Sequence, residues 1–180
     1  VVLAAVAQSG YALEYASPVL QANKEVVIVA LQQNVNALKY ASAELKADKE
    51  ILLAAVAQDG YALGYVQTGE LQADRDVVFA AVAQNWRALY FASDELKADK
   101  EVVLAAVAQD AFALEFASAK FRADKILVLA AVEQNGYALQ FASTKLKADV
   151  EVALAAASNQ RSALVFASAD VRMNFDALTQ

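Results

Sequence analysis

The chain has no histidine and no cysteine among its 180 residues. Histidine is the commonest general base and zinc ligand, so its absence removes the usual catalytic triads and most zinc sites. Without cysteine there is no disulfide framework and no thiol chemistry. The five glycines form no phosphate-binding loop. We therefore expect no catalytic residue, no cofactor, no metal site and no enzymatic activity.

Long hydrophobic runs and an excess of basic residues are also missing. The longest apolar runs have seven residues, for example Ile126 to Val132, whereas a membrane span needs about 20. The net charge is −6, and nucleic-acid binding calls for a basic stripe. We expect a chain that is not transmembrane, lies in a soluble compartment and binds no nucleic acid.

What the sequence does contain is a repeat, marked by the dipeptide Ala-Leu. It recurs every 25 residues with one step of 26, at Ala12-Leu13, Ala37-Leu38, Ala62-Leu63, Ala88-Leu89, Ala113-Leu114, Ala138-Leu139 and Ala163-Leu164. The extra residue falls near Thr68, in a segment that we interpret as a loop. A period of this length is typical of stacked repeat architectures.

Each repeat opens with a residue that caps helices: Asn23, Asp48, Asp74, Asp99, Asp124, Asp149 and Asn174. Asp and Asn side chains accept hydrogen bonds from the free N–H groups of a first helical turn. An apolar block follows, such as Val102 to Val107. Six apolar residues in a row leave no polar face, so we expect this first helix to be sandwiched between its neighbours.

The first helix ends at pairs such as Asp59-Gly60 and Asn135-Gly136, where we expect the glycine to adopt the left-handed conformation that ends many helices. A second helix follows. Pro18 comes directly after Ser17 and fits the first position of a new turn better than a helix interior. We therefore expect the second helix to end near the serine; the alternative is a helix that runs on to Leu45 and its equivalents.

Three rows of side chains recur with the repeat. We interpret the amides as partners of backbone groups at the turn between the two helices, and the serines as helix caps. The aromatic rings are interpreted as core. The rows are Gln8, Gln33, Gln58, Gln84, Gln109, Gln134 and Asn159; Ser17, Ser42, Ser93, Ser118, Ser143 and Ser168; and Tyr15, Tyr40, Tyr65, Phe91, Phe116, Phe141 and Phe166.

Positions that break the repeat indicate where partners bind, because core positions recur and surface positions vary. Trp86, Arg87 and Tyr90 break it together, and this combination is typical of interface hot spots. We therefore predict partner contacts at Trp86, Arg87, Tyr90, Val35, Asn36 and Val165.

The unit, as it reads from Asp99 to Ser118, resembles the tandem helical repeat called domain of unknown function 4116, over essentially the whole chain. The resemblance implies a helical repeat with no agreed activity and no catalytic residues. It also implies an origin in unicellular eukaryotes, algae among them, or in some bacteria. A peripheral subunit of an organelle membrane complex is one assembly that would fit such a source.

The predicted fold is all-α, an α-solenoid of about seven short two-helix repeats of about 25 residues wound into a right-handed superhelix. We expect residues 1–180 to be one continuous array, cut inside a repeat at both ends from a longer chain. We expect a non-enzymatic scaffold or linker whose partners are other protein subunits. The alternatives are a peptide-binding module and the recognition arm of an enzyme whose catalytic domain lies elsewhere.

Overall fold

The computed structural model describes residues 1–66 and 69–178, and the side chains as far as Asn174. These described residues form helices and connecting turns and contain no strand. The chain divides into two compact units, Val1–Ser93 and Asp94–Gln180. The extra residue near Thr68 lies outside the described residues.

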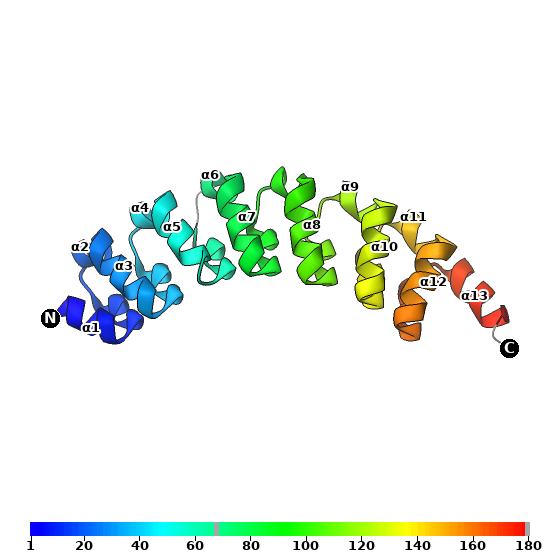
Figure 1. Cartoon of the computed structure of the whole chain (residues 1–180), viewed down its shortest axis with the longest axis horizontal. Coiled ribbons are helices and arrows are strands. Elements are labelled where there is room, and N and C mark those ends of the chain that lie inside the picture. The colour runs from blue at the N-terminus through cyan, green and yellow to red at the C-terminus, as the bar shows by residue number, and fades with distance from the viewer. Residues whose placement is uncertain (67–68, 179–180) are drawn as a thin grey trace. The chain divides into compact units, whose positions relative to one another are not determined.

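In the first unit the long α-helices stand side by side (Figure 1). Short 3₁₀-helices and one-turn α-helices connect them. The elements are α1 Val2–Gln8, η1 Gly10–Tyr15, α2 Pro18–Gln21, α3 Lys24–Gln33, η2 Val35–Tyr40, α4 Ala43–Lys46, α5 Lys49–Val56, η3 Gly60–Tyr65, α6 Gly69–Gln72, α7 Arg75–Gln84 and η4 Trp86–Phe91.

The second unit repeats the same order of helices. It begins with a short 3₁₀ turn before the first long helix. The elements are η5 Leu96–Ala98, α8 Lys100–Gln109, η6 Ala111–Glu115, α9 Ala119–Arg122, α10 Lys125–Gln134, η7 Gly136–Phe141, α11 Thr144–Lys147, α12 Val150–Asn159, η8 Arg161–Phe166 and α13 Ala169–Leu178.

Each repeat therefore has the two predicted helices and a third helical segment, which in most repeats is a single turn between the serine and the next cap, where the sequence also predicts one turn. The second helix is a 3₁₀-helix, and η1 ends at Tyr15, before Ser17. Pro18 is the first residue of α2, with Ser17 as its N-cap. The short reading of the second helix is confirmed, because the proline ring would clash with a continuing helix.

Six of the seven predicted Asp and Asn caps are confirmed as N-caps of long helices. In a typical case, Asp48 Oδ1 accepts hydrogen bonds from the backbone N–H groups of Glu50 at 2.9 Å and Ile51 at 3.1 Å. The others are Asn23, Asp74, Asp99, Asp124 and Asp149. The seventh prediction is wrong, because Asn174 lies inside α13.

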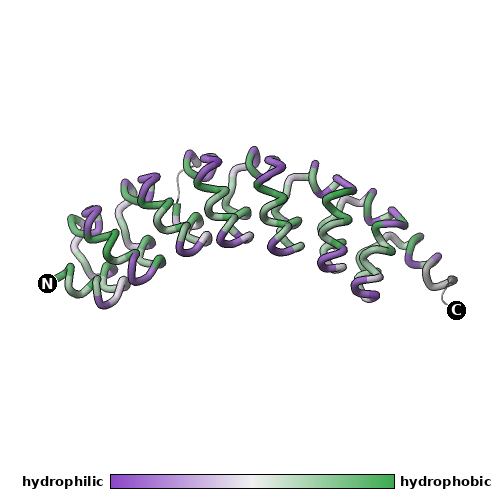
Figure 2. The backbone as a smooth tube through the Cα atoms, viewed as in Figure 1, coloured by the Kyte–Doolittle hydropathy of each residue, from purple (hydrophilic) through white to green (hydrophobic). Residues whose placement is uncertain are grey.

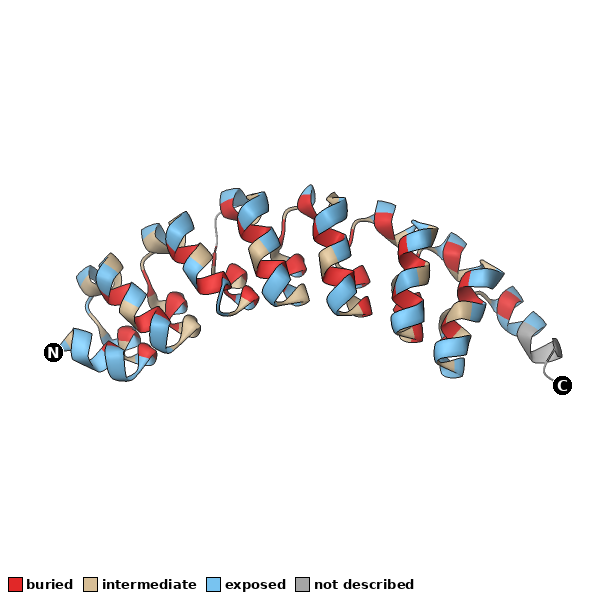
Figure 3. Cartoon of the chain, viewed as in Figure 1, coloured by how far each residue is buried: buried red, intermediate tan, exposed pale blue. Residues whose placement is uncertain are grey.

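The buried core follows the repeat. The helices α3, α5, α7, α8 and α10 each bury two adjacent residues and, one turn later, two more, as Val77, Val78, Ala81 and Val82 do in α7. Figure 3 shows exposed residues along the other side of these helices, and Figure 2 shows polar residues at their ends. The apolar residue after the first buried pair stays partly exposed, for example Phe79 and Leu104. The long helices are thus not sandwiched on all sides.

Backbone hydrogen bonds tie successive repeats together at the serine row. The N–H of each serine donates to a carbonyl at or next to the end of the one-turn segment in the preceding repeat. The bonds are Ser42 to Gln21, Ser93 to Gln72, Ser118 to Lys97, Ser143 to Arg122 and Ser168 to Lys147, at 2.7–2.9 Å. The prediction that the serine side chains cap is confirmed for Ser42, Ser143 and Ser168, which accept from N–H groups three residues on. It is wrong for Ser17 and Ser118, whose side chains accept no capping hydrogen bond.

The amide row is exposed. Two of its members bond to backbone groups near the end of a first helix, as predicted, and in both cases that helix belongs to the preceding repeat. Gln134 at the end of α10 donates to the carbonyl of Ala108 in α8 at 3.2 Å. Asn159 at the end of α12 donates to the carbonyl of Glu133 in α10 at 2.9 Å. The last carbonyls of an α-helix have no partner within the helix, so these amides satisfy carbonyls of the preceding repeat.

The interpretation of the aromatic row as core is wrong. Tyr15 is 87% exposed, and none of the described rings of this row is fully buried. The rings pack edge to face against an aromatic residue of the preceding 3₁₀-helix, because edge-to-face geometry is favourable for rings at this spacing. Within the two units the pairs are Tyr11–Tyr40, Tyr61–Phe91, Phe112–Phe141 and Tyr137–Phe166, with ring centroids 5.0–6.5 Å apart.

Candidate functional site

The predicted contact residues Trp86, Arg87 and Tyr90 all lie on the 3₁₀-helix η4, and we call them the η4 surface. The guanidinium carbon of Arg87 lies 4.3 Å from the centroid of the Trp86 ring, in a cation–π contact. Trp86 is half-buried, Arg87 is exposed and Tyr90 is 59% exposed. The structure thus brings the three side chains onto one short element at the surface of the first unit.

The remaining predicted contact residues lie on other elements. Val35 and Asn36 lie on η2 and are half-buried. The carboxamide oxygen of Asn36 accepts a hydrogen bond from the Tyr65 hydroxyl at 2.6 Å. Asn36 stands where other repeats have an aromatic residue, so this bond replaces a ring-to-ring contact. Its departure from the repeat therefore has a structural explanation.

Val165 lies on η8 in the second unit and is 59% exposed. Its carbonyl accepts a hydrogen bond from the Arg172 guanidinium at 3.1 Å. Val165 and Tyr90 both follow an Ala-Leu dipeptide, and both are exposed, as expected for positions that vary between repeats. Gly64, at the same position, is different because the Phe91 ring lies so close that a Cβ atom on Gly64 would be 2.5 Å from it.

The strongest electrostatic feature is a row of lysine–carboxylate contacts between successive long helices. The lysine that follows one cap binds both the cap aspartate of the next repeat and the acid two residues further on. Lys24 contacts Asp48 and Glu50 at 2.9 Å each, and Lys125 contacts Asp149 at 2.7 Å and Glu151 at 2.8 Å. Lys49 likewise contacts Asp74 and Asp76, at 2.6 and 3.5 Å.

These contacts shift the pKa values of their members. The hydrogen bond from Lys24 lowers the pKa of the Asp48 carboxyl, and Lys49 and Lys125 do the same to Asp74 and Asp149. The hydrogen bonds to the aspartates in turn raise the pKa values of the three lysines.

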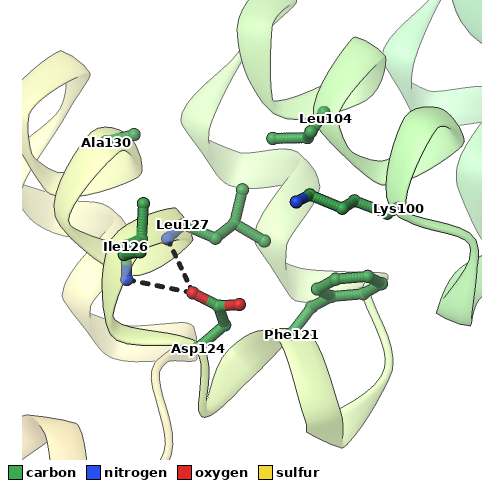
Figure 4. Close-up of a pocket in the computed structure, with 7 residues that line it drawn as sticks. All are labelled: Lys100, Leu104, Phe121, Asp124, Ile126, Leu127 and Ala130. Carbon is green, nitrogen blue, oxygen red and sulfur yellow. Dashed lines mark hydrogen bonds between the residues drawn. The ribbon is translucent and has the colours of Figure 1, made fainter.

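The second unit has one apolar cavity of about 120 Å³ beside α8, α9 and α10 (Figure 4). We call it the Lys100 pocket. Its walls are mostly hydrocarbon, and a lysine and an aspartate stand at its edge. It is lined by Lys100, Leu104, Phe121, Asp124, Ile126, Leu127 and Ala130.

Two residues of the Lys100 pocket depart from the repeat, and our reading of the sequence missed them. Ile126 stands where most other repeats have Glu or Asp two residues after the cap, and Phe121 stands where Leu45 and Leu146 do. The signal was present in the sequence as a gap in the row of acids. It was easy to overlook because an isoleucine extends the apolar block that follows it.

The described residues contain no group of three or more acidic side chains placed to hold a metal ion. The carboxylates of the caps are occupied by backbone N–H groups and, in three cases, by lysine. Within the described part of the chain, no helix is both long enough and apolar enough to cross a membrane.

Comparison with protein families gives four matches to one model, the domain of unknown function (DUF4116). The matched segments are residues 1–46, 23–72, 74–122 and 124–172. Neither the curated proteins nor the solved structures contain a match to this chain.

Proposed function

The chain belongs to the DUF4116 family, whose function is unknown, and on that premise we propose that it is a non-enzymatic scaffold or linker within a larger protein assembly. The single observation that carries the proposal is the η4 surface. Arg87 stacks on Trp86 and Tyr90 lies exposed beside them, although three of the other repeats have Gly at the first position and four have an aromatic residue at the second. Arg, Trp and Tyr are the residue types that dominate interface energetics.

For the architecture of this scaffold, we propose an α-solenoid wound into a right-handed superhelix. The support is that within each unit the extensive packing joins elements of the same or neighbouring repeats. Contacts of this kind are typical of solenoids, which use their extended surfaces to bind partners. An experimental structure in which distant repeats pack together, or in which the superhelix is left-handed, would contradict this part of the proposal.

The partners that we propose are other protein subunits rather than nucleic acid. The net charge of −6 would repel a phosphate backbone. The family name and the described geometry leave the compartment open, and a peripheral position on a membrane complex is compatible with a scaffold.

The test of the scaffold proposal restores the repeat's own consensus on η4. The double variant Trp86→Gly with Arg87→Tyr inserts the residue types that stand at the equivalent positions of the preceding repeat, Gly60 and Tyr61. The tagged wild-type chain is first used to identify its partner in source cells by crosslinking and mass spectrometry. Interferometry then measures both forms against that purified partner. Loss of interface Trp and Arg contacts should weaken binding by at least about thirtyfold.

The matched control is Asn36→Tyr, which restores the consensus at a residue whose side chain binds Tyr65 within the fold. We expect this control to bind as the wild type does, with circular dichroism confirming that both variants are folded. Unchanged affinity of a folded double variant would show that the η4 surface is not the contact site.

A further inference from the structure

The row of lysine–carboxylate contacts is interrupted at Lys100. Lys24, Lys49 and Lys125 each bind two carboxylates of the next repeat. For Lys100 the second carboxylate is absent because Ile126 occupies its place. Among the described residues Lys100 has no carboxylate within 4.0 Å. Its ammonium group is therefore a cation beside an open position, by which we mean the place that Glu50 and Glu151 fill beside the equivalent lysines.

The carboxylate of Asp124 is engaged on its other side. Its Oδ1 accepts hydrogen bonds from the backbone N–H groups of Ile126 at 3.0 Å and Leu127 at 3.1 Å (Figure 4). In the intact contacts a lysine is held between such a cap and a second acid. The geometry around Lys100 thus lacks one anion of the three-group arrangement that is present at Lys24, Lys49 and Lys125.

The open position adjoins the apolar Lys100 pocket. Figure 4 shows Lys100 reaching over the cavity, with the Phe121 ring below it and Leu104 and Leu127 beside it. Ile126 is 83% exposed and forms the outer wall. A volume of about 120 Å³ is that of about four liquid waters. It has room for one branched or aromatic side chain and is too small for a long acyl chain.

We propose that the Lys100 pocket binds a segment of a partner protein in which an Asp or Glu stands next to a Leu, Ile, Met or Phe. The partner carboxylate pairs with Lys100 in the position that Glu50 and Glu151 fill in other repeats. The neighbouring apolar side chain enters the cavity between Phe121 and Ile126. Charge complementarity selects the acid, and burial of the apolar side chain supplies affinity.

The Lys100 pocket shares no residue with the η4 surface, so an experiment can contradict one proposal without contradicting the other. Loss of partner binding at η4 leaves the Lys100 pocket unchanged. A failure of the pocket proposal likewise leaves the scaffold proposal unchanged. The inference goes beyond the scaffold role because it names the chemistry of one bound segment.

The test is selection of a random peptide library displayed on phage against the full chain. The selected peptides are then synthesised with neutral ends and titrated by fluorescence anisotropy. We expect an acid beside a large apolar residue to be enriched. The key variant is Ile126→Glu, which supplies the missing carboxylate from the chain itself, as Glu151 does for Lys125. It should weaken the selected peptides by at least about tenfold.

Two further variants distinguish loss of peptide binding at the pocket from loss of the fold. Ile126→Leu retains the apolar wall and should bind as the wild type does. Lys100→Gln should remove the preference for a peptide with Glu over the same peptide with Gln. Selection of no acidic apolar motif, or equal binding to the wild type and to Ile126→Glu, would overturn the proposal. So would saturable binding of dodecanoate that displaces the peptides, because it would assign the pocket to a fatty acid.

Discussion

The backbone of Gly60 lies against the carbonyl oxygen of Ala81 in the next long helix, so that a Cβ atom at residue 60 would overlap it. Gly136 stands in the same relation to Ala156, and a Cβ on Gly10 would lie 2.5 Å from the carbonyl oxygen of Ala30. None of the described glycines has a positive φ angle. Our expectation of a left-handed glycine is thus wrong, and close approach of neighbouring repeats explains the residue instead.

The first prediction follows from this contact. Gly60→Ala should destabilise the chain by about 1–3 kcal/mol, because a carbonyl in a packed helix cannot move aside without shifting the backbone. The matched control is Gly69→Ala in α6, where a Cβ would meet nothing within 4 Å. Urea unfolding followed by circular dichroism measures both variants. Equal midpoints would show that Gly60 does not set the distance between α5 and α7.

Features that depend on contacts within a few residues along the chain could be predicted from the sequence, and features that depend on contacts between repeats could not. Asp48 and Pro18 were read correctly because a cap and a helix start involve bonds within three or four residues. Gly60 and the ring of Phe91 were misread because their partners lie in neighbouring repeats, 20 to 30 residues away. A repeated sequence shows that an environment recurs, but not which neighbour supplies it.

The candidate sites divide in the same way. Trp86 and Arg87 could be predicted because they replace the commonest residues of two neighbouring positions, a glycine and an aromatic residue, with a larger and a charged residue. The Lys100 pocket could not be predicted from the sequence. Its recognition as a candidate site requires knowing that a lysine contacts an acid 26 residues later, as Lys24 contacts Glu50. Only with that contact known does Ile126 become a missing partner instead of one more apolar residue.

The second prediction concerns two serines at equivalent positions. Ser143 Oγ accepts a hydrogen bond from the backbone N–H of Leu146 at 3.3 Å, whereas Ser118 Oγ is buried and has no partner among the described residues. Ser143→Ala should destabilise by about 0.5–1 kcal/mol through the lost cap. Ser118→Ala removes an unsatisfied polar group and should be neutral or stabilising.

Thermal unfolding by calorimetry compares the two serine variants on the same chain. The decisive result is the order of the two midpoints rather than either value alone. A larger loss from Ser118→Ala than from Ser143→Ala would mean that Ser118 has a partner, such as an ordered water, and would contradict the prediction.

The third prediction is the acid stability of the lysine–carboxylate row. The pKa values of Asp48, Asp74 and Asp149 are lowered in the folded chain, chiefly by hydrogen bonds from Lys24, Lys49 and Lys125. An aspartate with a lowered pKa binds its proton less readily when folded than when unfolded. Its stabilising contribution is therefore present above the unfolded pKa, about 3.9, and is lost as the pH falls through the lower, folded value.

Replacing the three lysines together with methionine should raise the pH at which acid unfolds the chain, because the variant lacks the stabilisation that the contacts supply above the lowered pKa values and so tolerates less loss of stability from other groups. The measurement is circular dichroism during titration from neutral pH to pH 2. Lys145→Met is the matched control, since Lys145 is exposed and has no carboxylate partner among the described residues. High salt should reduce the difference between the triple variant and the wild type, because exposed ion pairs are screened. An acid midpoint that is unchanged in the triple variant would show that the row makes no contribution to stability at low pH.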